Sequence, residues 1–166
     1  MNFCTLTTVI NGRELKYDLE TNAIWCIDGR TKKWQAKSAT RDGEYLRMRI
    51  GNKKYKYHRI IYKFYNPDWD IEDGSQDNSI DHINGTKNDN RIVNLRNVTN
   101  QQNNWNQTKS NGCIWVERTK KWRARIRVSG KLIHLGYYDL KEDARNAYLE
   151  AKKIHHIINP ILCTGS

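Results

Sequence analysis

The chain lacks the features expected of a membrane or secreted protein. None of its apolar runs is long enough to span a bilayer, and no secretory signal begins the sequence. We therefore expect a soluble intracellular protein, located in the cytoplasm, without a membrane partner. No feature of the sequence implies a protein partner.

Paired cysteines are also lacking. The four cysteines stand at positions 4, 26, 113 and 163, and no two of them form a Cys-x-x-Cys pair. A structural zinc site is therefore not expected. Scattered, reduced thiols fit a cytosolic protein in which the cysteines are small buried or surface residues.

Hydrophobic residues are scarce, whereas basic residues are plentiful. Hydrophobic residues make up 37% of the 166 positions, which is low for one large core, although Trp occurs six times and Tyr nine times. One ordinary domain or two to three small modules with aromatic cores are expected. The net charge of +11 and the pI near 9.6 favour a polyanionic partner, either nucleic acid or an anionic membrane surface.

The first 55 residues have the pattern of a β-rich segment. In YLRMRIGNKKYKYH, residues 45–58, the apolar side chains at positions 46, 48 and 50 alternate with Arg47 and Arg49. The two sets therefore face opposite sides of a strand, and Gly51-Asn52 fits a two-residue hairpin turn. A short helix is expected next in HRIIYKFYN, ended by Pro67. The acidic loop that follows is either solvated or assists metal binding.

Two distant stretches resemble each other. Residues 24–37 read IWCIDGRTKKWQAK, and residues 114–125 read IWVERTKKWRAR. Each predicts a strand, a basic turn and a second strand. Two independent basic hairpins explain this similarity, and so does duplication of a DNA-binding hairpin.

The middle of the chain is rich in asparagine. Residues 80–107 contain nine asparagines and a single histidine, although asparagine is unfavourable inside helices and strands. SIDHI and NLRNV predict two short strands around a turn-rich loop. Because Thr99 and Gln102 have capping-box spacing, a helix should start at Asn100 and carry Asn103, Asn104 and Gln107.

The Asp81-His82 pair suggests hydrolytic chemistry. Neighbouring side chains on a strand point to opposite faces, so one can bind a metal while the other faces the substrate. A neutral imidazole can take a proton from water, and a divalent metal with oxygen ligands can stabilise phosphorane charge and the leaving 3′ oxygen. Asn103 can offer an amide oxygen, and Asn94 can bridge backbone groups of the loop and orient His82.

The last segment predicts a sheet and a helix. WRARIRV alternates strictly, so positions 122, 124, 126 and 128 take one face while Arg123, Arg125 and Arg127 take the other. LIHLGYY supplies a third strand. Asp139 and Glu142 have the spacing of a helix cap. The following helix carries an apolar face, made of Ala144, Ala147, Tyr148, Ala151 and Ile154.

DHINGTKNDNRIVNLRNVTNQQN closely resembles the HNH nuclease motif of phage and intron-encoded homing endonucleases. The resemblance implies a ββα-metal fold in which His82 is the general base, Asp81 and Asn103 are the metal ligands, and Asn94 braces the catalytic loop. The preceding YHRIIYKF matches the upstream helix of these nucleases, and His58 in it is expected to be structural. Asn103 stands where many relatives have a second histidine, which leaves open whether one or both strands are cut.

The C-terminal segment resembles the plant ethylene-response-factor (APETALA-two) DNA-binding domain through Trp-x-Ala, Leu-Gly-x-Tyr and Glu-Asp-Ala-x-x-Ala-Tyr. That family places a three-stranded sheet in the major groove. A solvated sheet face is the alternative reading of the arginines. The resemblance and the charge pattern together predict a set of DNA contacts. These are Arg47, Arg49, Arg96, Arg118, Lys121, Trp122, Arg123, Arg125 and Arg127.

The expected fold class is α+β. The expected parts are a β-rich segment at 1–55, a ββα-metal nuclease core at 56–107, an ethylene-response-factor-like domain at 108–158 and a tail at 159–166. The expected function is a metal-dependent HNH endonuclease of homing type, from a phage or mobile element, that nicks or cuts double-stranded DNA. Mg²⁺ is the expected ion and Mn²⁺ a substitute. If phage-encoded, the protein would act in the host cytoplasm.

Two alternatives from other classes stay open. A non-catalytic, sequence-specific DNA-binding regulator could retain the nuclease fold without cutting. An RNA-binding protein is another possibility, because basic aromatic sheets also bind single strands.

Overall fold

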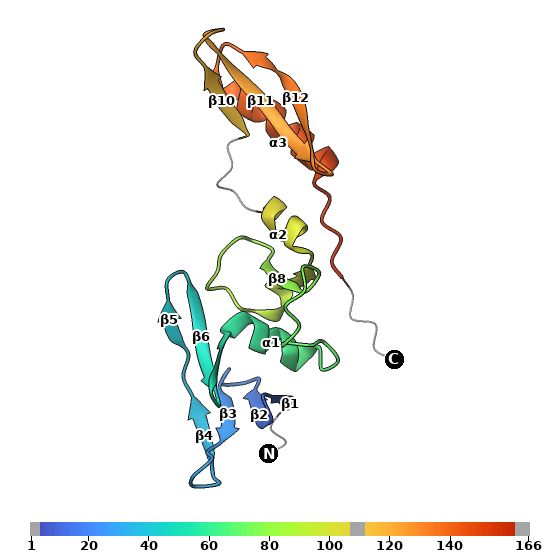
Figure 1. Cartoon of the computed structure of the whole chain (residues 1–166). Coiled ribbons are helices and arrows are strands. Elements are labelled where there is room, and N and C mark those ends of the chain that lie inside the picture. The colour runs from blue at the N-terminus through green and yellow to red at the C-terminus, as the bar shows by residue number, and fades with distance from the viewer. Residues whose placement is uncertain (1–3, 107–111, 162–166) are drawn as a thin grey trace. The chain divides into compact units, whose positions relative to one another are not determined.

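The computed structural model describes residues 4–106 and 112–161, which form two compact units (Figure 1). Among the described residues, the first unit runs to Thr99 and includes Pro160 and Ile161, and the second unit runs from Asn100 to Asn159. The mixture of helices with small antiparallel sheets confirms the α+β class. Within the described ranges, none of the helices has the length and apolar character needed to cross a membrane.

The first unit begins with two antiparallel sheets. The four-stranded sheet has its strands in chain order: β1 (Thr5–Ile10), β2 (Arg13–Asp18), β3 (Ile24–Ile27) and β4 (Trp34–Lys37). The three-stranded sheet follows: β5 (Thr40–Asp42), β6 (Tyr45–Ile50) and β7 (Lys53–Lys56). Ile50 pairs with Lys53, which confirms the two-residue turn at Gly51-Asn52. Met48 and Ile50 are buried, as the alternation predicts.

Helix α1 (Tyr57–Tyr65) and a strand pair complete the first unit. The helix ends two residues before Pro67, because the residue preceding a proline is disfavoured in helical conformation. The pair consists of β8 (Ser79–His82) and β9 (Leu95–Val98), joined by a loop whose last turn is the 3₁₀ helix η1 (Ile92–Asn94). The predicted order of strand, loop and strand is confirmed.

A single core joins these elements. Ile10 and Leu15 from the first sheet, Ile60 from α1, and Ile80 and Leu95 from the strand pair belong to one buried cluster. The residues predicted as a separate N-terminal segment therefore share their core with the strand pair of the predicted nuclease core. The predicted domain boundaries stay predictions.

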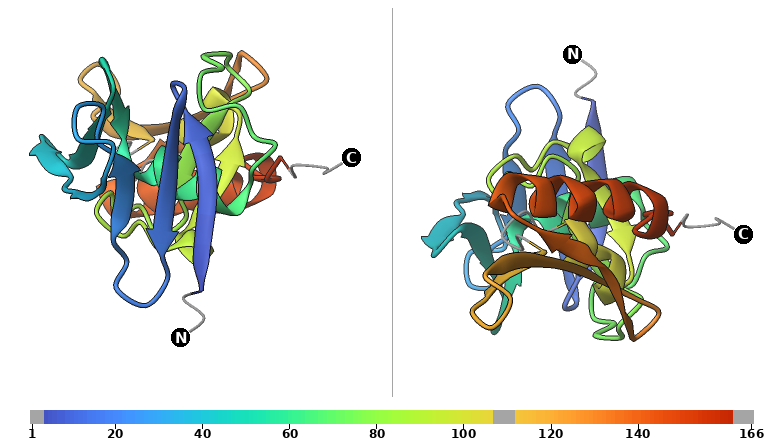
Figure 2. Two further views of the ribbon diagram at one scale, coloured as in Figure 1. Left: turned by 90° about the horizontal axis from the view of Figure 1, so that it is seen from below. Right: turned by 90° about the horizontal axis from the view of Figure 1, so that it is seen from above.

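The second unit contains α2 (Asn100–Asn106), a three-stranded sheet and α3 (Lys141–His155). The start of α2 at Asn100 confirms the prediction, whereas Gln107 lies outside the described residues. The sheet consists of β10 (Cys113–Val116), β11 (Lys121–Val128) and β12 (Lys131–Tyr138). Figure 2 (right) shows α3 lying across this sheet.

Small residues allow α3 to approach the sheet closely. Ala124 and Ala144 are fully buried, and Ala151 and Tyr148 are nearly so. Gly112 has φ +64°, and a Cβ there would lie 1.9 Å from the Tyr148 ring, so only glycine fits without moving that ring.

Two details of α3 differ from the prediction. Leu140, not Asp139, is the N-cap residue, and it makes no side-chain cap hydrogen bond. Asp139 instead forms a salt bridge with Lys121 at 3.1 Å, so its carboxylate is used across the sheet rather than at the helix start. Ile154 is 66% exposed, because it lies in the last turn, beyond the buried positions.

The two similar stretches both form hairpins, β3–β4 and β10–β11. Each turn contains one lysine with positive φ at the matching position, Lys32 at 56° and Lys120 at 48°. This shared geometry leaves both explanations of the similarity open. Cys4, Cys26 and Cys113 are free thiols, whereas Cys163 lies outside the described residues.

Candidate functional site

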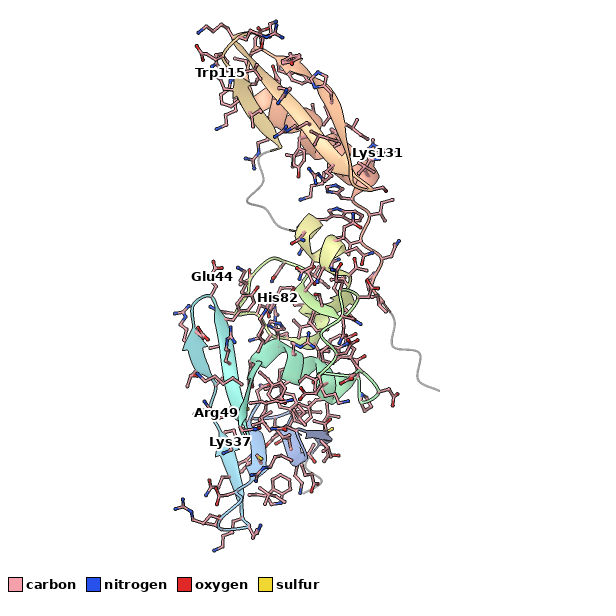
Figure 3. All side chains as sticks on the ribbon, in the orientation of Figure 1. Lys37, Glu44, Arg49, His82, Trp115 and Lys131 are labelled. Carbon is pink, nitrogen blue, oxygen red and sulfur yellow. The ribbon has the colours of Figure 1, made fainter. Side chains whose placement is uncertain are left out.

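Asp81 and His82 are the last two residues of β8. Strand alternation sends their side chains to opposite faces of the β8–β9 pair. Asp81 lies across from Arg96, and His82 lies across from Leu95. Both residues are buried, at 6% and 4% exposure, and Figure 3 marks His82 within the first unit.

An asparagine of the loop holds His82. Its Nε2 lies 3.1 Å from Oδ1 of Asn90. With the amide oriented in this way, Nε2–H donates to the oxygen, because an amide oxygen can only accept. The neutral ring then carries its lone pair on Nδ1. Asn90 therefore fixes Nε2 of His82 as the donor nitrogen, and Nδ1 is the basic nitrogen of this tautomer.

Two aromatic rings surround His82. The His58 ring, from α1, meets it edge to face with 4.8 Å between centroids, and the Tyr45 ring lies 6.3 Å away. Burial, together with smaller contributions from His82, Lys56 and Arg59, lowers the pKa of His58 to about 2. His58 is therefore uncharged at neutral pH, which fits the structural role expected for it.

Asp81 forms a buried ion pair with Arg96. Nε and Nη2 of the guanidinium donate to Oδ2 of the carboxylate at 3.0 and 2.9 Å. The side chains are 15% (Arg96) and 7% (Asp81) exposed. Arg96 is predicted to contact DNA; the structure turns its guanidinium toward Asp81, and a DNA contact stays a prediction.

Asn94 braces the loop between β8 and β9. Its Oδ1 accepts the backbone N–H of Asn84 at 3.0 Å, and its Nδ2 donates to Oδ1 of Asn84 at 3.0 Å and to the carbonyl of Asp89 at 2.8 Å. Asn94 thus bridges backbone groups of the loop, as its position in the sequence suggests. The amide that reaches Nε2 of His82 comes from Asn90, which the braced loop carries.

An ion pair also stabilises the loop between β8 and β9. Arg91 donates two hydrogen bonds to Asp89, and these hold the pKa of that carboxyl well below its usual range. Asp89 also accepts from Nδ2 of Asn84 at 2.9 Å. The asparagines therefore satisfy the hydrogen-bonding groups of a loop that has few apolar side chains to bury.

The predicted metal ligands are Asp81 in the first unit and Asn103 in α2 of the second. Whether Asn103 approaches Asp81 stays a prediction. Among residues 4–106 and 112–161, no three His, Cys, Asp or Glu side chains are grouped to hold a metal. One carboxylate and one amide oxygen nevertheless fit a hard divalent cation, which takes its other oxygen ligands from phosphate and water.

The predicted DNA contacts lie in both units. Arg47 and Arg49 are on β6, and Arg47 lies 2.8 Å from Asp42. On β11, Arg123, Arg125 and Arg127 alternate with buried Ala124 and Ile126, so the predicted alternation is confirmed.

Two other predicted contacts have partners within the second unit. Trp122 packs against the core around Ala124, and Lys121 pairs with Asp139. Arg118 lies in the turn between β10 and β11. DNA contact by any of these residues stays a prediction.

Sequence reasoning missed two residues of the His82 environment. Asn90 was one of several similar loop asparagines, and no spacing rule separated it from its neighbours. Tyr45 lies 37 positions before His82 in the chain, so only the folded structure brings the two rings together.

Comparison with known families identifies the middle segment. Residues 55–105 match a family model described as HNH endonuclease. The match includes Asp81, His82, Asn94 and Asn103, and it agrees with the resemblance noted in the sequence. No curated protein and no solved structure gave a significant match. The segment thus supports a nuclease that acts on DNA, whereas the homing type and the C-terminal resemblance stay predictions.

Proposed function

We propose that this chain is a divalent-metal-dependent endonuclease that hydrolyses phosphodiester bonds in double-stranded DNA. One observation carries the proposal beyond the family match. His82 ends β8 with Nε2 held by Asn90 and with the neutral ring of His58 against it. A histidine fixed in this way is suited to general-base catalysis.

The chemistry at His82 follows from its tautomer. Nδ1 accepts the proton of a water molecule, and the resulting hydroxide attacks phosphorus in line with the P–O3′ bond. That bond breaks, the leaving O3′ takes a proton from solvent water, and the products carry 5′-phosphate and 3′-hydroxyl ends. His82 then returns its proton to solvent. Nε2–H stays bonded to Asn90 throughout, so the ring keeps its orientation while it becomes positively charged. The uncharged His58 adds no positive charge that would oppose this step.

Asp81 and Asn103 would hold the divalent metal, with Mg²⁺ as the ion and Mn²⁺ as a substitute. When bound, this ion supplies Lewis-acid stabilisation of the charge on the scissile phosphate and the leaving oxygen. Arg96 keeps the buried carboxylate of Asp81 in a fixed orientation. The arginines of β11 bind the duplex, and the homing type from a phage or mobile element is part of the same proposal.

A second candidate is a DNA-binding regulator without catalysis. The ion pair between Asp81 and Arg96 favours it, because a guanidinium already satisfies Oδ2 of the proposed metal ligand. In such a protein, Asp81 would have only a structural role.

Incubation of supercoiled plasmid with the purified chain separates the two candidates. The proposed function predicts nicked or linear products in Mg²⁺ or Mn²⁺, none in EDTA, and 5′-phosphate ends that a ligase can join. A regulator would shift the mobility of the plasmid and leave it uncut in every metal. That result would overturn the proposed nuclease.

A further inference from the structure

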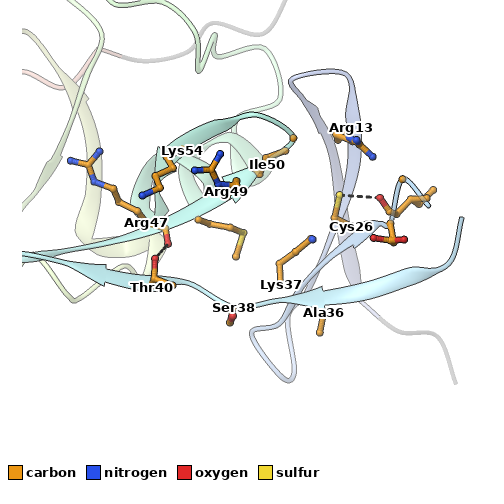
Figure 4. A pocket seen from close by; sticks show the side chains of 15 residues that line it. Arg13, Cys26, Ala36, Lys37, Ser38, Thr40, Arg47, Arg49, Ile50 and Lys54 are labelled. Carbon is orange, nitrogen blue, oxygen red and sulfur yellow. Dashed lines mark hydrogen bonds between the residues drawn. The ribbon is translucent and has the colours of Figure 1, made fainter. Parts of the chain in front are cut away.

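A basic groove lies in the first unit, between the sheet of β1–β4 and the sheet of β5–β7 (Figure 4). Its volume is about 640 Å³. Cys26, Met48 and Ile50, which are buried, contribute to its floor. All its lining residues fall between positions 13 and 54, outside the segment that matches the HNH family.

The cations of this groove come from four different strands. They are Arg13 on β2, Lys37 on β4, Arg47 and Arg49 on β6, and Lys54 on β7. Charged side chains on one strand are usually a solvated face and need no ligand. Here two sheets converge so that cations distant in sequence share one concave surface. Such a cleft concentrates positive potential and attracts anions.

Little negative charge offsets these cations. Asp28 also lines the groove, but its carboxylate accepts the backbone N–H groups of Arg30 and Thr31 at 3.1 and 2.7 Å and the Thr31 hydroxyl at 2.9 Å. These bonds keep Asp28 ionised and engaged in its own turn. Arg47 is paired with Asp42 at 2.8 Å.

The other four cations, Arg13, Lys37, Arg49 and Lys54, form no salt bridge within the part of the chain that the structure describes. Arg49 donates to the backbone carbonyl of Asn52 at 3.3 Å. The pKa of Asp28 is lowered chiefly by its hydrogen bonds with Thr31 and to a smaller extent by the charge of Lys37. Their excess positive charge is unfavourable for the free protein, because like charges on one concave surface repel each other.

The lining also indicates the class of ligand. Small-molecule sites are mostly apolar, with a few placed polar groups. This groove is more polar than that, since five of its fifteen lining residues are cations and Asp28, Ser38 and Thr40 line it as well. Most protein–DNA hydrogen bonds go to phosphate and sugar oxygens, and lysine and arginine are among their usual donors.

We propose that this groove binds the sugar–phosphate backbone of the DNA substrate, away from the bond that is cut. The proposal rests on the proposed function only in taking duplex DNA as the substrate. The N-terminal sheets thereby add a second backbone contact to the one expected from β11. They position the duplex without reading its sequence.

Adjacent lysines on β7 provide a matched test. Lys54 lines the groove, whereas the next side chain, Lys53, points to the opposite face and lies 2.8 Å from Glu72. The test variant is Lys37→Ala with Lys54→Ala. The control is Lys53→Ala with Lys16→Ala, since Lys16 lies over the Trp34 ring at 4.1 Å and does not line the groove. Both variants lose two positive charges from the same two sheets.

The measurement is the affinity of the full chain for mixed-sequence duplex DNA across a salt series, by fluorescence anisotropy in EDTA. Each lost phosphate contact makes the plot of log K against log salt shallower by about one unit. The groove variant should therefore lose about two units of slope and bind two unrelated duplexes more weakly by the same factor. The control should keep the wild-type slope, and Lys37→Arg with Lys54→Arg should restore it.

Equal slopes in the groove variant and the control would overturn the proposal. A loss confined to one DNA sequence would also overturn it, because it would mean base reading instead of backbone binding. If the double variant does not fold, the single variants Lys54→Ala and Lys53→Ala carry the same comparison with about one unit of slope at stake.

Failure of the groove and failure of the nuclease are distinguishable. Binding is measured without metal, so it does not depend on cutting. Suppose that the groove variant has a shallower salt slope than wild type but that wild type leaves plasmid intact in Mg²⁺. This result would refute the nuclease and support the groove. Wild type that cuts plasmid while the groove variant keeps its slope would refute the groove alone.

Discussion

At the scale of single residues, the last two residues of β8 have side chains with different partners. Asp81 and His82 are adjacent in the chain, yet one is paired with Arg96 and the other with Asn90. Strand alternation directs the carboxylate and the imidazole to opposite faces of the strand pair. In the proposed mechanism, this alternation would place charge stabilisation by Asp81 and proton transfer by His82 on opposite faces.

The contact of Asn90 with Nε2 of His82 predicts that Asn90 acts as a positioning residue. Asn90→Ala should lower kcat roughly 10-fold to 100-fold with little change in DNA affinity, because a general base needs hydrogen-bond reach to its proton. Asn90→Asp should move the acid limb of the pH–rate profile to higher pH, since a carboxylate at Nε2 favours the imidazolium form. A pH series of plasmid cleavage measures both effects. An unmoved acid limb in Asn90→Asp would contradict the contact.

Arg96 should stabilise the fold through Asp81. Arg96→Ala leaves a buried carboxylate without its partner, and breaking such a pair costs about 3–5 kcal/mol. Thermal unfolding in EDTA should show a large loss of stability. Mg²⁺ should restore more stability to this variant than it adds to wild type, because the ion and the guanidinium neutralise the same carboxylate.

Arg91→Ala is the matched control for Arg96. Arg91 pairs with Asp89 in the same motif, but its side chain is 76% exposed. Exposed pairs contribute little to stability, so this variant should unfold close to wild type. Equal losses in the two arginine variants would mean that burial of the Asp81–Arg96 pair has no energetic consequence.

At the scale of elements, Asn94 determines the shape of the loop between β8 and β9. Asn94→Ala removes three hydrogen bonds, each contributing about 1 kcal/mol net. We expect a loss of about 3 kcal/mol in denaturant unfolding and a fall in cleavage, because the loop carries Asn90. Val93→Ala is the control, because Val93 precedes Asn94 in the chain and is 78% exposed. Unchanged stability in Asn94→Ala would contradict the bracing role.

Some elements were predictable because one local rule determines each of them. Alternation of apolar and basic residues predicted the faces of β6 and β11, and the spacing of Thr99 and Gln102 predicted where α2 begins. The prediction that Asp139 caps α3 was wrong, because its carboxylate forms a salt bridge with Lys121 of β11 instead. Spacing along the chain carries no information about such a competitor.

The candidate site was predictable in its chemistry but not in its supporting contacts. Asp81, His82 and Asn94 stand out by residue type and spacing. The contacts of His82 with Asn90, His58 and Tyr45 join three separate segments. They depend on how α1 and the two sheets share a core, which periodicity does not specify.

At the scale of the whole molecule, basic surfaces occur in both units. Arg123→Ala, Arg125→Ala and Arg127→Ala together should weaken DNA binding strongly and relax site choice, because a lost bidentate base contact costs about 1–3 kcal/mol. Slow metal-dependent cutting should persist at high protein concentration, since His82 belongs to the other unit. Binding to cognate and unrelated duplexes across a salt series measures the effect.

The control for the triple variant removes three cations from α3 instead, Arg145, Lys152 and Lys153. It loses the same charge from the helix rather than from the sheet. Equal losses in both triple variants would mean that β11 contributes only net charge. Unchanged site choice in the β11 variant would move the reading surface away from this sheet.

The most direct test of the account is His82→Ala, measured in parallel for plasmid cleavage in Mg²⁺ and for DNA binding in EDTA, with the exposed His155→Ala as control. The account predicts a fall in cleavage of roughly 10²-fold to 10⁴-fold, the usual contribution of a general base, with binding and the His155 variant unchanged. Cleavage by His82→Ala within about threefold of wild type, below any general-base contribution, would contradict the account and remove His82 from the mechanism.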